Sequence, residues 1–270
     1  HLVGPQYGLV FPDHPEPPAA ELVELASAIL AAKEASTFVD CVVEVGQALW
    51  DKDETALRAL ADSLGAASHA ETAQKIATGT ERRAELKHYS GAMFYYAGEW
   101  YWGVDRLYHL EQRLADLGAD CKPGEPLLAP RPEIEVGETR DTGTLTLEVY
   151  PSLRSPYTAI SFDRAVKLAE DTGVKLVVRP VLPMVMRGVP ATREKGLYIF
   201  MDTAREARSA GVPYGKSYDP IGDPVRRCYS IYPWAIEQGR GNQLISSFLR
   251  HAWALGVNTN NERGLRRVVE

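Results

Sequence analysis

A short polar motif, Ser155 followed by Pro156, is the clearest place for chemistry in this sequence. The pair is typical of a helix start, because a serine hydroxyl accepts a hydrogen bond from the first turn and proline fits the first helical position. The positive end of a helix and its unpaired backbone N–H groups attract anions. The sequence therefore predicts a helix start at Ser155 that is suited to an anionic ligand.

The cysteines and histidines do not form a reactive or metal-binding group. Cys41, Cys121 and Cys228 leave no C-x-x-C spacing, which excludes a dithiol redox pair and a zinc knuckle. We expect Cys41 and Cys228 to be small apolar side chains of the core. His88 and His109 have no well-placed second ligand in the sequence, so no metal site is expected.

The composition is that of a globular protein with one large domain or two modest ones. The chain has 270 residues, of which 45% are hydrophobic and 24% charged, and its net charge is −6. This charge disfavours nucleic acid as a partner, and no apolar run reaches the roughly 18–20 residues of a membrane span. Unpaired cysteines and the lack of a signal-peptide pattern predict a cytoplasmic protein.

The Ser155 motif lies inside a predicted β-α-β unit. Alternating apolar and polar side chains predict a strand near residues 145–149. The helix that follows starts at Pro156 and ends at Gly173, since helices commonly end at a residue with positive φ. The apolar segment 175–181 predicts a second strand, buried on both faces. The turn between the first strand and the helix therefore presents Ser155.

Helices dominate both ends of the sequence. Those expected before residue 87 cover 19–36, 37–50, a segment from an Asp53 cap to Gly65, and a segment from a Ser68–Glu71 capping box toward Leu86. Those expected after the β-α-β unit cover 192–208, a segment from an Asp223 cap to about Gly239, 244–255, and a segment from Asn258. Residues 4–18 read as a loop and residues 118–143 as a linker.

An aromatic hairpin is predicted in the middle of the chain. The segments 93–96 and 99–102 are rich in aromatic residues and flank Ala97-Gly98, a two-residue turn. Packing across the hairpin explains these aromatics better than a substrate wall does. A helix with an apolar leucine face is expected to follow, with Asp105 as its cap.

An internal repeat links the two helical regions. Gly4-Pro-Gln-Tyr-Gly8 resembles Gly211-Val-Pro-Tyr-Gly215, and Leu57-Arg58 resembles Leu265-Arg266. The offset between the copies is about 207 residues, and two apolar helices lie between the matching motifs in each copy. The helical regions at the two ends are therefore predicted to be copies of one element.

Four segments together resemble the DsbA-like group of thioredoxin-fold proteins, specifically 2-hydroxychromene-2-carboxylate isomerases and kappa-class glutathione transferases. The segments are Ser155-Pro-Tyr-Thr158, Arg179-Pro180, Lys195-Gly-Leu-Tyr198 and Gly103-Val-Asp-Arg-Leu107. The resemblance covers most of the chain. It implies an α/β, thioredoxin-like fold with large helical insertions, split over two repeats.

The resemblance also implies an activity: a glutathione-dependent isomerase or transferase acting on a small aromatic electrophile. Ser155 stands where redox relatives have their first cysteine, and in this family its hydroxyl is proposed to donate a hydrogen bond to the thiol of bound glutathione. Lys195 and Asp105 match residues that hold the tripeptide. Pro156 and Tyr157 complete the expected cofactor-binding motif.

The order of the segments is unusual for this family. Residues 1–117 resemble the helical insert and the β-β-α half of a first unit, and residues 144–270 the β-α-β half and insert of a second. The sequence thus reads as an internal fragment of a tandem protein. The alternatives are a circular permutant, in which 144–182 and 87–117 complete one sheet, and a domain-swapped homodimer. Ser155 and Asp105 would share one pocket only in these two alternatives.

Two departures from the family support a second hypothesis. The segment Ser90-Gly91-Ala92-Met93 lacks the proline that thioredoxin-like proteins place before the third strand in the cis form, so a trans bond is expected here. The segment 186–191 lacks the asparagine of the family. The alternative function is a non-catalytic thioredoxin-like protein for binding or dimerisation, or a relative of protein disulfide oxidoreductases that has lost its C-x-x-C.

Overall fold

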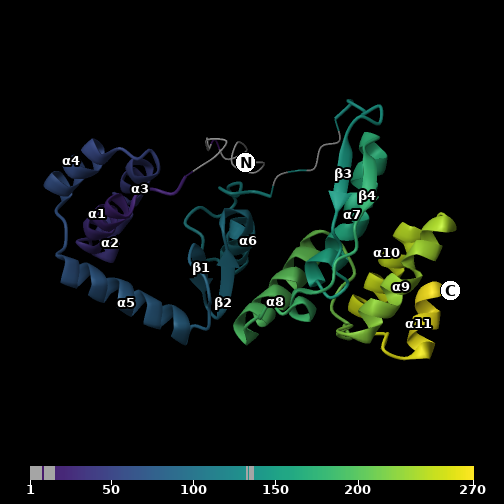
Figure 1. The fold of residues 1–270 in the computed structure, drawn as a ribbon. Coiled ribbons are helices and arrows are strands. Elements are labelled where there is room, and N and C mark those ends of the chain that lie inside the picture. Colours follow the sequence, from purple (N-terminus) through teal and green to yellow (C-terminus); the bar gives the residue numbers. More distant parts are fainter. Residues whose placement is uncertain (1–7, 9–15, 132, 134–136) are drawn as a thin grey trace. The chain divides into compact units, whose positions relative to one another are not determined.

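The computed structural model describes residues 8, 16–131, 133 and 137–270, which form a mixed α/β chain (Figure 1). The chain divides into two compact units, residues 1–90 and residues 91–270. Most of the loop predicted over 4–18, and the first copy of the glycine motif apart from Gly8, lie outside the described residues. The described part of the predicted linker 118–143 contains no helix or strand.

The first unit is helical, as predicted. Its helices are α1 (Ala20–Ala31), α2 (Ala35–Phe38), α3 (Val42–Trp50), α4 (Glu54–Leu64) and α5 (His69–Glu85). The helix predicted over 37–50 is wrong at its start, because the backbone leaves the helical ladder between α2 and α3. The core of α1, α3 and α4 contains Ile29, Val45 and Leu57, all fully buried.

The predicted caps of the first unit are confirmed. Asp53 accepts a hydrogen bond from the Ala56 N–H at 2.9 Å at the start of α4. Ser68 and Glu71 form the reciprocal capping box at the start of α5. Each cap satisfies backbone N–H groups that have no partner inside the helix.

The second unit begins with the predicted hairpin. Strand β1 (Met93–Tyr96) pairs antiparallel with β2 (Glu99–Trp102), and Ala97 and Gly98 both have positive φ, as a type I′ turn requires. A short 3-10 turn, η2 (Val104–Arg106), leads into α6 (Leu107–Asp116). The prediction that Asp105 caps this helix is wrong: Asp105 lies inside η2, and its carboxylate pairs with Arg106 at 2.7 Å.

The β-α-β unit is confirmed as β3 (Thr146–Val149), α7 (Pro156–Thr172) and β4 (Lys175–Val178). The two strands are parallel, and Thr146 is opposite Lys175. Gly173 ends α7 with a φ of 74°, and a Cβ there would lie 2.6 Å from the Asp141 carbonyl oxygen, so glycine is required. The second strand is shorter than predicted, and the prediction that it is buried on both faces is wrong, because Lys175 is exposed and the other three residues are only half-buried.

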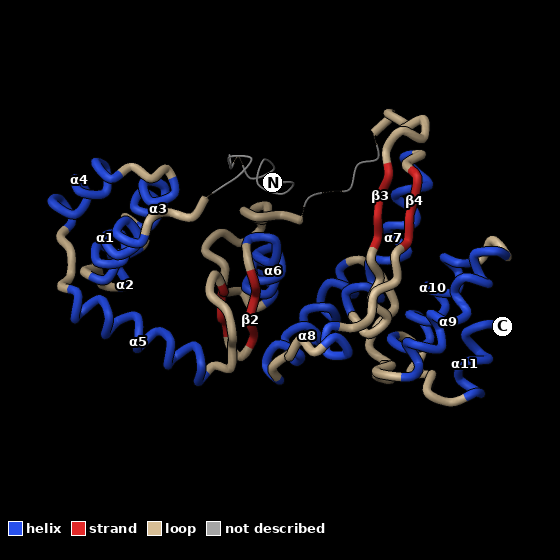
Figure 2. The backbone as a smooth tube through the Cα atoms, in the orientation of Figure 1, coloured by secondary structure: helices blue, strands red, loops and turns tan. Residues whose placement is uncertain are grey.

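Each strand pair forms its own two-stranded sheet in the described part of the chain (Figure 2). The permuted alternative, with 144–182 and 87–117 in one sheet, is therefore not formed. The predicted division into repeats at 117 and 144 concerns the origin of the segments and stays a prediction.

Helices complete the second unit: the 3-10 turn η3 (Met184–Arg187), then α8 (Arg193–Ser209), α9 (Asp223–Glu237), α10 (Gly241–Trp253) and α11 (Glu262–Val269). The Asp223 cap is wrong, because α9 begins at this residue and Gly222 precedes it without a side-chain cap. Asn261, not Asn258, caps α11, through the Gly264 N–H. Side chains of α9 and α10 form the main core with Leu153 and Phe162 of the β-α-β unit.

Candidate functional site

A cavity of about 490 Å³ opens beyond the carboxyl ends of β3 and β4. Its walls come from the turn between β3 and α7, the segment after β4, and the first turns of α8. Trp253 of α10 and apolar side chains such as Leu182 and Phe200 line the rest. Ligand pockets are typically of this size, mostly apolar with a few polar groups. Four of the five predicted site residues line it: Ser155, Pro156, Tyr157 and Lys195.

Ser155 is half-buried at the start of α7, as the sequence predicts. Its Oγ accepts a hydrogen bond from the Thr158 N–H at 3.3 Å, and its own N–H donates to the Ser152 carbonyl at 2.9 Å. A serine hydroxyl that accepts one bond still has its hydrogen to donate. The side chain can therefore cap the helix and donate to a ligand atom in the cavity.

The charge of this cavity favours an anion. Three basic side chains line it, Arg154, Arg187 and Lys195, against one carboxylate, Asp219. Arg154 pairs with Asp219 at 2.7 Å, whereas Arg187 and Lys195 have no carboxylate partner within the described residues. The amino ends of α7 and α8, each 17 residues long, add the positive ends of their dipoles.

Tyr157 belongs to two cavities, and its hydroxyl is already engaged. The hydroxyl donates to Oδ2 of the buried Asp202 at 2.7 Å. Burial, and next the charge of Asp202, raise the pKa of Tyr157 well above its usual value. Tyr157 therefore stays protonated at neutral pH and has no second hydrogen to donate to a ligand.

Asp105 lies in a neighbouring cavity of about 350 Å³. This cavity shares the Tyr157 wall with the first and is also lined by Trp102, Arg106, Tyr198 and Asp202. Ser155 and Asp105 do not share one pocket here: they line two cavities that have the Tyr157 wall in common, and the strand pairs remain separate.

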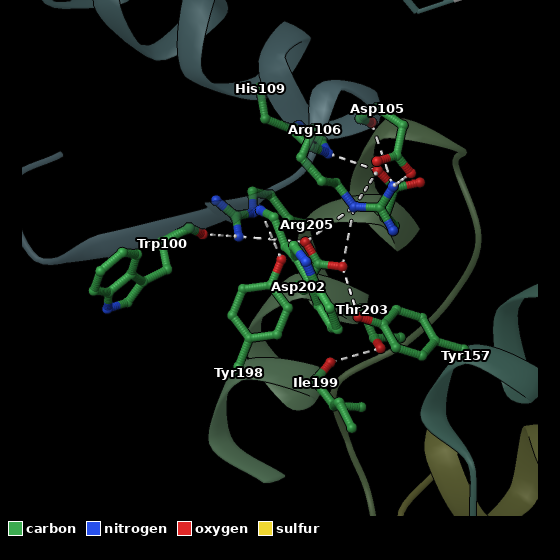
Figure 3. A network of polar contacts seen from close by, with 12 residues as sticks. Trp100, Asp105, Arg106, His109, Tyr157, Tyr198, Ile199, Asp202, Thr203 and Arg205 are labelled. Carbon is green, nitrogen blue, oxygen red and sulfur yellow. Dashed lines mark hydrogen bonds and ion pairs between the residues drawn. The ribbon is translucent and has the colours of Figure 1, made fainter. Parts of the chain in front are cut away.

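A network of buried charges that the sequence did not reveal lies beside these cavities (Figure 3). Asp202 is fully buried on α8 and accepts from Arg106 Nε at 3.1 Å and from Arg205 at 3.4 Å. Tyr198 accepts a hydrogen bond from the Trp102 N–H at 3.1 Å. The only signal in the sequence was the spacing of four between Tyr198, Asp202 and Glu206, which places them on one helix face.

Glu206 is the second buried carboxylate of this network. It bonds His109 Nε2 at 2.9 Å and the Tyr108 hydroxyl, and it pairs with Arg131 at 3.3 Å. Burial alone would raise its pKa, but these hydrogen bonds and the charges of Arg106 and Arg131 outweigh burial and hold the pKa at about 2. His109 is thus a partner of Glu206, and no cluster of metal-ligating side chains exists among the described residues.

The cysteines are free, and none of them lines the cavity. Cys41 and Cys228 are buried, as predicted, and Cys121 is exposed. Burial raises the pKa of Cys228 to about 12, which keeps its thiol protonated.

Comparison with family models, curated proteins and solved structures found no match to this chain. Within the described residues, no helix combines the length and apolar character that crossing a bilayer requires.

Proposed function

We propose that this protein is a glutathione-dependent isomerase or transferase in which the Ser155 hydroxyl stabilises the glutathione thiolate. The observation that carries this proposal is the cavity of about 490 Å³ at the start of α7, where Ser155 lies in walls with more basic than acidic side chains. The thiol proton passes to solvent, and the thiolate forms a carbon–sulfur bond with a small aromatic electrophile. In a transfer the displaced electron pair departs with a leaving group, whereas in an isomerisation it moves from a carbon–carbon double bond into the conjugated system and returns when the thiolate is expelled.

The absence of a cysteine thiol from the described walls of the cavity supports an external thiol. No cysteine is among the described residues that line the cavity, so a thiolate at this helix start must arrive with a ligand. Tyr157 cannot take the place of Ser155, because its only hydroxyl hydrogen is donated to Asp202. Ser155 is therefore the residue best placed to donate to the sulfur.

The charge distribution suits a tripeptide that carries two carboxylates and one ammonium group. The carboxylates favour the cavity with Arg187 and Lys195, which have no acidic partner in the part of the chain that the structure describes. The ammonium group favours the neighbouring cavity, where Asp105 supplies an exposed carboxylate. This asymmetry supports the proposed roles of Lys195 and Asp105 in holding glutathione.

The fold assignment belongs to the same proposal. The proposal is supported by element order: a parallel β3–α7–β4 unit, and a β1–β2 hairpin followed by α6, match the order of elements in the two halves of a thioredoxin-like fold with helical insertions. We assign the protein to the cytoplasm, where glutathione is kept reduced.

One observation favours the non-catalytic alternative, a binding or dimerisation protein. All described peptide bonds are trans, including the one before Met93, so the backbone arrangement by which thioredoxin-like proteins pair with the glutathione cysteine is not reproduced there. Two-stranded sheets with open edges also offer sites for strand addition, in a homodimer or a domain-swapped assembly.

Calorimetric titration with glutathione distinguishes these functions. The proposal predicts affinity tighter than millimolar, weakened about 10- to 100-fold in Ser155→Ala by loss of one hydrogen bond to a charged group. The matched control is Ser161→Ala, an exposed serine of α7 that does not line the cavity. S-methylglutathione should bind wild type and Ser155→Ala equally, because it has no thiol to ionise. Absent or millimolar binding by the folded wild-type protein would leave the non-catalytic alternative.

A further inference from the structure

The geometry points to Asp202 as a positioning residue that holds the three ligand-binding regions of the site together. This inference rests on the proposed function, because it concerns the residues proposed to bind glutathione. Asp202 lies on α8, and its side chain is only 1% exposed. It therefore acts on the ligand through the residues that it contacts. Two of its partners, Tyr157 and Arg106, lie within two residues of a residue proposed to bind the ligand, Ser155 or Asp105.

The first region is the start of α7. Asp202 accepts the hydroxyl hydrogen of Tyr157 at 2.7 Å, and Tyr157 is two residues after Ser155. This bond ties the first turn of α7 to α8. The Tyr157 ring also forms the wall common to both cavities, so the bond fixes the boundary between them.

The second region is the turn η2. Arg106 donates from Nε to both oxygens of Asp202 at 3.1 Å, and Arg106 directly follows Asp105. The same guanidinium binds the Asp105 carboxylate at 2.7 Å. The position of Asp105 in its cavity therefore depends on where Asp202 holds Arg106 (Figure 3).

The third region is the start of α8 itself. Lys195 precedes Asp202 by seven residues, which is about two helical turns on the same face. Arg205, also on α8, donates to Asp202 and to the Trp100 carbonyl at 2.9 Å, which fastens β2 to the same helix. Ser155, Asp105 and Lys195 are thus positioned relative to one buried carboxylate.

Burying a carboxylate is costly unless it is fully paired, and here two arginines and one tyrosine supply the pairing. Apolar side chains could join these elements equally well, but without directing Tyr157 and Arg106 to one point. Preorganised groups bind a ligand more tightly, because less conformational freedom is lost on binding. We therefore expect Asp202 to affect both glutathione affinity and the ionisation of the bound thiol.

The test compares Tyr157→Phe, Asp202→Asn and the control Glu194→Gln in the full chain. Tyr157→Phe keeps the ring and both arginine contacts, so it should fold, and we expect glutathione affinity to fall about tenfold. Asp202→Asn should weaken binding at least as much. Both should raise the pKa of the bound thiol, read from its thiolate absorbance. Glu194 is an exposed acid in the first turn of α8, and its variant should match wild type.

A measurement without ligand separates this inference from the proposed function. Hydrogen exchange of the free proteins should become faster at the start of α7 and at η2 in Asp202→Asn, and faster at the start of α7 alone in Tyr157→Phe. If this exchange pattern is seen but wild type does not bind glutathione, Asp202 is still the residue that positions the start of α7 and η2, and glutathione is not the ligand. Unchanged exchange at both places, or unchanged affinity and thiol pKa in a protein that binds glutathione, would overturn the inference.

Discussion

The helices α1, α3 and α4 of the first unit and α9, α10 and α11 of the second are the two predicted copies of one helical element. In the part of the chain that is described, only the second copy contributes a residue to the candidate site, Trp253 of α10. Each middle helix ends in a tryptophan, and an Asx residue caps each last helix. Trp50 at the end of α3 is 59% exposed, whereas Trp253 at the end of α10 is 5% exposed. The difference lies in what covers the second tryptophan.

Trp253 is covered by the β-α-β unit. Its indole N–H donates to the Leu153 carbonyl at 3.0 Å, in the turn that leads to Ser155, and its side chain lines the cavity. The helical element alone therefore does not make a site. The site arises where the helices support the strand-to-helix turn that presents Ser155.

The largest expected effect is the loss of stability when each of the two tryptophans is replaced by alanine. Trp253→Ala should lower the free energy of unfolding of the second unit by about 3–5 kcal/mol, because a buried aromatic leaves a cavity. Trp50→Ala should change that of the first unit by no more than about 0.5–1 kcal/mol. Native-state hydrogen exchange, which reports each unit separately, measures both. Equal losses in the two units would contradict the comparison.

The second largest effect is expected at low pH, where the second unit should lose more stability than the first. The pKa of Glu206 is about 2 in the folded protein, against 4.5 for the unperturbed group. Because the folded pKa is depressed, the stabilisation is complete above about pH 4.5 and is lost as the pH falls toward 2, an effect of about 3 kcal/mol.

Glu206→Gln should abolish this part of the acid sensitivity in the second unit. The measurement is the free energy of unfolding of each variant as a function of pH. In the first unit, hydrogen bonds from Ser68 lower the pKa of the exposed Glu71, and no comparable loss is expected there. An acid profile of the second unit that Glu206→Gln leaves unchanged would count against the buried network.

A smaller effect on stability is expected from substitutions at the third residue of α4 and of α11. Ala56 of α4 and Gly264 of α11 both donate their N–H to the capping side chain. A Cβ at Gly264 would clash with the Asn258 carbonyl oxygen, so Gly264→Ala should destabilise the second unit by about 1–3 kcal/mol. Ala56→Gly should cost the first unit about 0.5–1 kcal/mol through backbone entropy. Thermal unfolding of the two variants provides the measurement, and a neutral Gly264→Ala would show that the loop before α11 gives way.

Local features of this fold could be predicted from sequence. Ser155, Ser68 and Asp53 cap the helices predicted for them, and Ala97-Gly98 forms the predicted turn. In each case the decisive contact lies within three or four residues along the chain. The side chain and the backbone group that it meets are therefore visible together in the sequence.

The predictions that failed concern features that depend on contacts between residues far apart in the chain. Asp105 was predicted as a cap, but Arg106 draws it into a network with Asp202, 96 residues further along the chain than Arg106. Nothing near Asp202 in the sequence indicates that its carboxylate is buried. The separation of the two strand pairs into two sheets also depends on contacts far apart in the chain. Four of the predicted site residues still share a cavity, because Ser155, Pro156 and Tyr157 are adjacent and α8 brings Lys195 to them.

The most direct test of the central claim is the pKa of the glutathione thiol when it is bound to this protein. Ultraviolet absorbance of the thiolate, followed against pH at saturating glutathione, gives that pKa for wild type and for Ser155→Ala. The Ser155 account predicts a pKa below that of free glutathione in wild type and a rise of about 1–2 units in Ser155→Ala. A bound thiol with the same pKa in both proteins, or with the pKa of free glutathione in wild type, would contradict it.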